Sequence, residues 1–190
     1  MQPLTVTIIG QGKVGSALGA GLLRAGHQVM YTNRDTIRQA CEGADVIIVS
    51  AVPKATHDII DALQDVVSGT ILIDAMNSVS SKPEGYATST HAFQQQLPSV
   101  HVAKCFNTVG YEVMANPVFG NDRATMFMAG DDAVAKDMAR RLALDIGFGS
   151  CEDVGGSNRY ETLEHLAMVW ISMAIMQGKG RSFAWHLIER

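Results

Sequence analysis

The chain has 190 residues, enough for one domain that buries a sizeable core without disulfides or metals. Its formal net charge of −4 gives no broad electrostatic reason to bind nucleic acid or an anionic membrane surface. The 3 cysteines form no C-x-x-C pair, and no His, Cys and Asp cluster has metal-ligand spacing, which argues against a disulfide framework or a metal site.

The two ends of the chain give no sign of a membrane segment or a signal peptide. The first ten residues lack a charged stretch followed by a long apolar one. The longest apolar-looking run, 166–176, is too short to span a bilayer. We therefore expect a soluble, cytoplasmic protein.

Strand-like apolar runs alternate with helical patterns along the whole chain. The first run, Leu4 to Ile9, ends at a glycine loop, and apolar residues then recur at helical spacing as far as Ala25. The region 76–88 is rich in Ser, Asn, Gly and Pro and is predicted to be a loop. Further strands are predicted at 28–32, 44–49, 70–73, 100–104, 124–129 and 149–154, and helices at 35–41, 54–65, 91–96, 132–144, 157–177 and 182–188.

Repeated strand–helix units of this spacing predict an α/β fold of the Rossmann type, with a doubly wound, mostly parallel sheet. We expect one such domain over residues 1–190, in which 155–190 form a short C-terminal helical appendage. The helix 157–177 carries an apolar stripe and Trp170. A helix this apolar must cover its own sheet or a partner's, so we expect a homodimer with this stripe at the interface.

The glycine loop follows a predicted strand and opens a predicted helix, which is the context that a dinucleotide-binding motif requires. Gly10 permits the tight turn, Gly12 lets the backbone approach a pyrophosphate, and Gly15 lets the helix pack close to the strand. The pyrophosphate would then lie on the free N–H groups of the helix N-terminus. The alternative is a glycine-rich turn without a ligand. The motif reads Gly10-Gln11-Gly12-Lys13-Val14-Gly15.

The end of the second strand distinguishes NADP from NAD. A site for NAD usually has an acid there, whereas this chain has Asn33 and Arg34. Arg34 can make a bidentate contact with a 2′-phosphate, and Arg38 would lie one helical turn beyond it. Two solvated surface arginines, one of them paired with Asp35, are the alternative. The pattern favours NADP.

With these residues the chain resembles the coenzyme F420-dependent NADP oxidoreductase family, over nearly its whole length. Three segments carry the resemblance besides the glycine loop: Ala51-Val52-Pro53, Lys104-Cys105-Phe106-Asn107-Thr108-Val109 and Met126-Phe127-Met128-Ala129-Gly130-Asp131-Asp132. The chain departs from the family pattern at Cys105, where alanine is common, and at His165, where the C-terminal helix often has proline.

The resemblance implies roles for individual residues. It places the 2′-phosphate at Asn33, Arg34 and Arg38, and the nicotinamide near Ala51, Val52 and Pro53. Phe106, Asn107 and Thr108 would line the pocket in which the two redox rings meet. That last segment also lies at the carboxyl end of a predicted strand, where open α/β sheets bind ligands. Asn107 and Thr108 could instead form a plain turn.

The function that follows is hydride transfer between NADP(H) and a deazaflavin (F420) coenzyme. A reductase with a flavin or another small-molecule acceptor, and a non-enzymatic NADP(H) sensor, are the alternatives. Hydroxyacid and imine dehydrogenases share the N-terminal pattern but need a large helical domain, and only about 40 residues follow the sheet here. Such a transfer needs ring alignment more than a base, so no catalytic residue is assigned.

Overall fold

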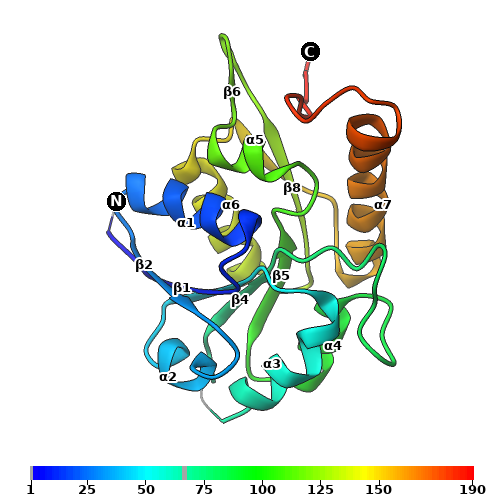
Figure 1. Ribbon diagram of the computed structural model, residues 1–190. Helices are drawn as coiled ribbons and strands as arrows, with labels where there is room; N and C mark the ends of the chain where they lie inside the picture. Colours follow the sequence, from blue (N-terminus) through cyan, green and yellow to red (C-terminus); the bar gives the residue numbers. More distant parts are fainter. Residues whose placement is uncertain (1, 66–67) are drawn as a thin grey trace.

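The computed structural model describes residues 2–65 and 68–190 (Figure 1). Within them a 7-stranded sheet has the order β2-β1-β3-β4-β5-β8-β9, and its first five strands are parallel. Strand β8 is antiparallel to β5, and β9 is parallel to β8. The strands span Thr5–Ile9 (β1), Gln28–Thr32 (β2), Val46–Val49 (β3), Ile71–Asp74 (β4), His101–Cys105 (β5), Thr125–Ala129 (β8) and Ser150–Asp153 (β9), and the hairpin β6–β7 spans Val118–Phe119 and Asp122–Arg123.

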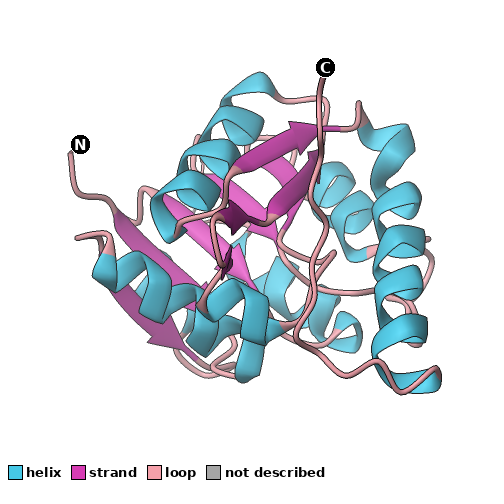
Figure 2. Ribbon diagram, turned by 90° about the horizontal axis from the view of Figure 1, so that it is seen from above, coloured by secondary structure: helices cyan, strands magenta, loops and turns pink. Residues whose placement is uncertain are grey.

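The helices form two layers, one on each face of the sheet (Figures 1 and 2). One hydrophobic core joins the sheet to α1, α5 and α6, and a second joins it to α2, α3 and α4. Strand β3 is buried along its whole length, as a parallel strand covered on both faces should be. The helices span Lys13–Arg24 (α1), Ile37–Cys41 (α2), Thr56–Leu63 (α3), Ser89–Gln96 (α4), Tyr111–Ala115 (α5), Ala133–Ile146 (α6) and Tyr160–Ile171 (α7).

The predicted Rossmann-type, mostly parallel sheet is confirmed, but the chain departs from the prediction at two places. The short helix α5 and the hairpin β6–β7 lie between β5 and β8, where no element was predicted. The predicted helix 182–188 is wrong, because this tail is non-helical and binds the sheet through its backbone. Thr125 N donates to Trp185 O, and Trp185 Nε1 donates to Thr108 O.

The apolar stripe of α7 packs inside its own chain. Leu163 joins a small core with Ala129, and the Trp170 ring stacks on Phe183 of the tail at 5.3 Å. These residues are therefore not available at a subunit interface, which corrects the predicted location of the dimer contact. The exposed apolar side chains at this end of the chain are instead Val169, Ile175 and Met176. The homodimer itself stays a prediction.

None of the helices in the described part of the chain is long and apolar enough to cross a membrane.

Candidate functional site

The glycine loop connects β1 to α1 and is held in a shape that only glycine permits at two positions. Gly10 has φ of +102°, and a Cβ there would lie 2.9 Å from the backbone oxygen of Ser50. A Cβ on Gly15 would collide with the carbonyl oxygen of Gly10 and with Ser50 Oγ. Ser50 Oγ donates to that same carbonyl at 2.8 Å. These contacts give Gly10 and Gly15 the turn and packing roles expected from the motif.

Gly12 differs, because a Cβ on it would meet no atom within 4 Å. It occupies the N-cap of α1 with an extended backbone and no capping side chain. The first N–H groups of the 12-residue helix therefore face open space, which a side chain at position 12 would fill. That space suits a pyrophosphate, which would accept from these groups at the positive end of the helix dipole.

A narrow pocket of about 160 Å³ lies on one side of the loop and is lined mainly by apolar surface. Gly10, Asn33, Arg34 and Ala51 all line it, so four of the predicted cofactor residues meet at one place. Its apolar walls include Ile37, Ile59 and Ala55. An apolar slot beside a glycine loop, with an arginine at its mouth, fits the adenosine end of a dinucleotide and its 2′-phosphate.

The two predicted phosphate-binding arginines each pair with a separate carboxylate. Arg34 Nη2 lies 3.0 Å from Asp58 Oδ2 on α3, and Arg38 Nη2 lies 3.6 Å from Asp65 Oδ2. All four side chains are largely exposed, so these ion pairs are weak and rearrange easily. The structure therefore brings only Arg34 to the pocket, and the predicted convergence of both guanidinium groups is absent among these described residues. The alternative, in which one of the two arginines pairs with Asp35, differs from the structure, where the partners are Asp58 and Asp65.

Asn33 is held by the turn that ends β2. Its Oδ1 accepts from the backbone N of Asp35 at 3.0 Å and from Thr36 Oγ1 at 3.3 Å. Because the carbonyl side of the amide is occupied, the NH₂ group is the part that can donate to a phosphate.

The segment Ala51-Val52-Pro53 does not act as one unit. Ala51 lines the same pocket as Asn33 and Arg34. Val52 is 64% exposed, whereas Pro53 is buried and begins a short 3₁₀ turn, Pro53–Ala55, before α3. The nicotinamide role that the resemblance implies for the three residues stays a prediction.

On the other side of the loop, Gln11, Gly12 and Lys13 line an open pocket together with Tyr111 of α5. Lys13 Nζ lies 5.2 Å from the centre of the Tyr111 ring, and the guanidinium of Arg181 lies 5.0 Å from it. Lys13 therefore stands near the helix N-terminus, where a pyrophosphate would be neutralised, whereas Arg181 is paired with Glu112. Val14, the remaining predicted residue of the loop, packs its side chain against the core and can offer only its backbone N–H.

Phe106, Asn107 and Thr108 follow β5, and their side chains are almost fully buried. Phe106 has φ of +65° and lies in the core, while Thr108 Oγ1 donates to Met126 Sδ. Asn107 Nδ2 lies 3.2 Å from Asn77 Oδ1 and 3.3 Å from Leu163 O of α7. The structure thus places Phe106 and Thr108 in the interior, away from the lining of the described pockets, whereas Asn107 donates a hydrogen bond to α7.

Charged side chains are buried beside Asn107, at the ends of β4 and β5. Lys104 and Asp74 are both 0% exposed, and Lys104 Nζ lies 3.6 Å from Asp74 Oδ2. Asp74 accepts from Ser89 Oγ at 2.5 Å, Thr90 Oγ1 at 2.6 Å and the backbone N of Met76 at 3.0 Å. This carboxylate is therefore fully hydrogen-bonded.

Glu164 of α7 completes the buried cluster. It is 5% exposed, and its Oε1 lies 2.8 Å from Lys104 Nζ, which donates to the backbone oxygen of Met76. Both of its carboxylate oxygens are buried with no hydrogen-bond partner among the described residues, so the contact of Oε1 with Lys104 is an ion pair without a hydrogen bond. The pair joins residues that lie 60 positions apart, and sequence reasoning assigned it no role. A lysine inside an apolar strand and a glutamate inside an apolar helical stripe were the available signals.

The surroundings of His57 and His165 indicate no catalytic role for either residue. His57 Nε2 lies 3.0 Å from Glu84 O and ties α3 to the loop after β4, and His165 is exposed on α7. The described residues contain no group of three His, Cys, Asp or Glu side chains that could hold a metal ion.

The family model described as NADP oxidoreductase, coenzyme F420-dependent, matches residues 5–40, which hold β1, the glycine loop, β2 and most of α2. No curated protein matches the chain.

Solved structures share the fold over nearly the whole chain. A protein from Arthrobacter sp. FB24, assigned as an F420-dependent NADP reductase, is 20% identical with a TM-score of 0.85, covering 98% of this chain and 100% of its own. A hypothetical protein from Sinorhizobium meliloti is 25% identical, with a TM-score of 0.64. That alignment covers 97% of this chain and 93% of the other protein.

A reductive aminase from Aspergillus terreus in complex with NADPH is 15% identical, with a TM-score of 0.66. That alignment covers 93% of this chain but only 64% of the aminase. The match of residues 5–40 confirms the predicted resemblance to the coenzyme F420-dependent NADP oxidoreductase family over that segment, and the solved structures share the Rossmann-type fold of the whole chain.

Proposed function

We propose that this oxidoreductase transfers a hydride between the nicotinamide of NADP(H) and a deazaflavin coenzyme of the F420 type. The observation that carries the NADP half is the glycine loop with open space at Gly12 and Arg34 at the mouth of the adjoining apolar pocket. The acceptor is supported by the family description matched by residues 5–40. When bound, NADPH supplies the hydride.

The described residues have clear tasks in such a transfer. The N-terminal N–H groups of α1 and the Lys13 ammonium hold the pyrophosphate, and Arg34 and Asn33 hold the 2′-phosphate. The buried side chains at the sheet edge around Asn107 would limit water near the transferring hydride. Positioning of the two rings then supplies most of the rate enhancement, because the hydride transfer needs no base.

Imine reduction is the second candidate, suggested by the similarity of fold to the reductive aminase. The chain spans 64% of the length of that enzyme. The family description matched by residues 5–40 favours the F420-type acceptor over the imine.

The test measures cofactor binding first and turnover second. Titration of protein fluorescence should give a Kd for NADPH at least tenfold below that for NADH, and Arg34→Ala should remove most of this preference, worth about 1.4 kcal/mol. NADPH oxidation is then followed with F420, FMN, FAD, a ferric chelate and a cyclic imine. Turnover fastest with F420 supports the proposal. Equal affinity for the two nicotinamide cofactors contradicts it, and binding without turnover of any acceptor indicates a sensor.

A further inference from the structure

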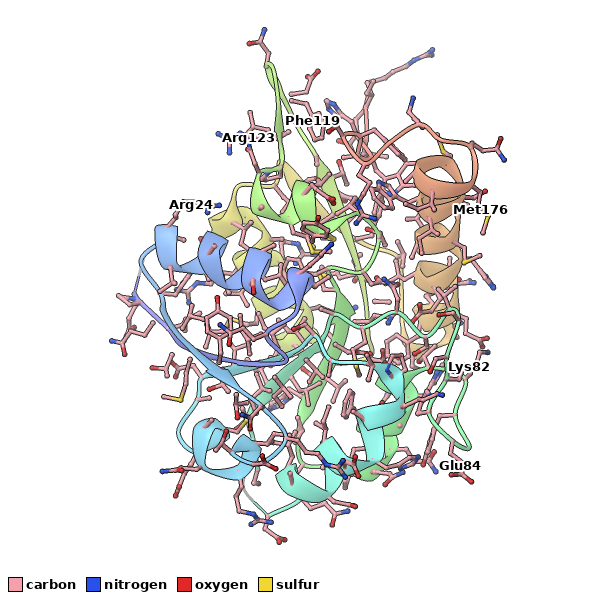
Figure 3. All side chains as sticks on the ribbon, viewed as in Figure 1. Arg24, Lys82, Glu84, Phe119, Arg123 and Met176 are labelled. Carbon is pink, nitrogen blue, oxygen red and sulfur yellow. The ribbon has the colours of Figure 1, made fainter. Side chains whose placement is uncertain are left out.

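A pocket of about 200 Å³ lies between the segment that follows β4 and the helix α7. Ser78 and Lys82 line it from the segment, and Glu164, His165 and Met168 line it from α7. Figure 3 shows Lys82 on the side of the molecule where α7 stands. None of these residues lines either pocket beside the glycine loop. The pocket is therefore separate from the places assigned to adenosine and pyrophosphate.

Glu164, which lines this pocket, belongs to a buried cluster with an unmatched charge. Asp74 and Glu164 are two carboxylates beside the single ammonium of Lys104, which leaves one formal negative charge in the cluster. Asp74 is satisfied by its three donors, so the deficit falls on Glu164, whose two oxygens accept no hydrogen bond among the described residues. A buried carboxylate oxygen without a donor is costly, and a ligand with an N–H group would relieve that cost.

The pocket lies on the side of the sheet where the nicotinamide is expected. The adenosine-side pocket is formed by the segments that follow β1, β2 and β3. Asp74 and Lys104 belong to β4 and β5, the next strands of the parallel sheet. A dinucleotide lies across the switch point of such a sheet, with its second nucleotide over the later strands. A ring bound beside Glu164 is therefore on the nicotinamide side of the molecule.

We propose that this pocket binds the electron acceptor and that Glu164 selects a flat heterocycle with an N–H group, the imide of a flavin or deazaflavin ring. This inference rests on the proposed function and names the group that would recognise its acceptor. The Lys104 ammonium lies beside Oε1, so Oε2, which has no contact with this cation, is the oxygen proposed to accept from the imide. Met168 offers a soft, polarisable surface for a ring. Lys104 is thus a positioning residue, and Glu164 determines specificity.

The test uses ring analogues with and without the imide hydrogen. The full chain, saturated with NADP⁺, is titrated with lumiflavin, 5-deazalumiflavin and the N3-methyl form of each, and binding is read from quenching of ring fluorescence. We expect N3-methylation to weaken binding to the wild type at least tenfold. The stronger of the two unmethylated rings identifies the acceptor as a flavin or a deazaflavin.

The variant Glu164→Gln supplies the matching change in the protein. Lys104 will attract the amide oxygen of the new side chain, which turns its NH₂ group toward the ligand, so that a donor meets a donor. We expect the unmethylated rings to bind at least tenfold more weakly and the N3-methyl rings to bind as before. Glu161→Gln, an exposed acid on the same pocket, is the control and should change affinity less than twofold.

Three results would overturn the inference: equal binding of methylated and unmethylated rings by the wild type, unchanged binding by Glu164→Gln, or no ring binding up to millimolar concentration. The first comparison needs no variant, so a folding defect in Glu164→Gln cannot obscure it. The NADPH Kd is measured in parallel. A wild type that fails to bind NADPH contradicts the proposed function, whereas intact NADPH binding without ring discrimination contradicts the assignment of Glu164 alone.

Discussion

The two ends of the candidate site are built in different ways. At the adenosine end the backbone of one loop shapes the site, and its charged side chains are exposed and paired on the surface, as Arg34 is with Asp58. At the α7 end the backbone contributes little, and three buried charged side chains, Asp74, Lys104 and Glu164, come from three separate elements. Changes at the first end should therefore alter binding more than folding, and changes at the second should do the reverse.

The largest expected effect is on stability, at the buried end. Lys104→Met removes the only cation of the buried cluster and leaves two carboxylates facing each other. Breaking a buried pair in this way costs about 3–5 kcal/mol in the free energy of unfolding. Arg34→Ala, which breaks an exposed pair, should cost less than about 1 kcal/mol. Urea denaturation of both variants measures the contrast, and similar losses for the two would show that the ends do not differ.

A pair of glycine variants separates binding from folding within the loop itself. Gly12→Ala places a methyl group in open space, so stability should change little while the NADPH Kd rises at least tenfold, about 1.4 kcal/mol. Gly15→Ala forces the methyl group into the backbone of Gly10 and should also cost about 1–3 kcal/mol of stability. Thermal melts and NADPH titrations distinguish the two. Full NADPH affinity in Gly12→Ala would contradict a pyrophosphate at this position.

A smaller effect, a gain in NADPH affinity, is expected from a substitution at Asp58. Asp58 competes with a 2′-phosphate for Arg34 and also repels its charge. Asp58→Asn should lower the NADPH Kd about threefold, close to 0.7 kcal/mol, and leave NADH affinity unchanged. Asp65→Asn is the matched control, because Asp65 pairs with Arg38 outside the pocket. An equal gain from both variants would instead mean that Arg38 also reaches the phosphate.

The smallest effect concerns the attachment of α7. Hydrogen bonds from Ser157, with one from Gln94, hold the pKa of Asp131 below its usual value. A carboxyl whose pKa is lower in the folded state than in the unfolded state stabilises the fold above the unfolded pKa and loses this contribution as the pH falls through the folded value. The wild type should therefore lose stability relative to Asp131→Asn below about pH 4, the ordinary range for an aspartate. If the free energies of unfolding of the wild type and of Asp131→Asn change in parallel from pH 7 to pH 3, Asp131 makes no such contribution.

Much of the adenosine end could be predicted because its signals are local. Within six residues, the spacing of Gly10, Gly12 and Gly15 sets the tight turn, the open space for a pyrophosphate and the close packing of α1 on β1. Arg34 follows the end of β2, the next strand along the chain. The sequence did not predict which carboxylate pairs with each of the two arginines at this end. Asp58 and Asp65 lie beyond the next strand, so their positions depend on how α3 packs.

The α7 end could not be assembled from sequence patterns. Phe106, Asn107 and Thr108 follow a strand, as predicted for pocket residues, but a positive φ at Phe106 turns this aromatic side chain into the core. The tail 182–188 has a pattern compatible with a helix, yet its backbone pairs with Thr125 and its Trp185 side chain donates to Thr108 O instead. In both cases tertiary contacts decided between local alternatives of similar energy.

The sequence by itself thus determined the alternation of strands and helices, the Rossmann-type sheet and the loop that can receive a dinucleotide, because periodicity and glycine spacing act over a few neighbouring residues. Only the tertiary structure decided which buried charges meet. Lys104, Asp74 and Glu164 are far apart in the chain, and an unpaired ion in the interior is so costly that the packing of α7 against the sheet had to bring their side chains together.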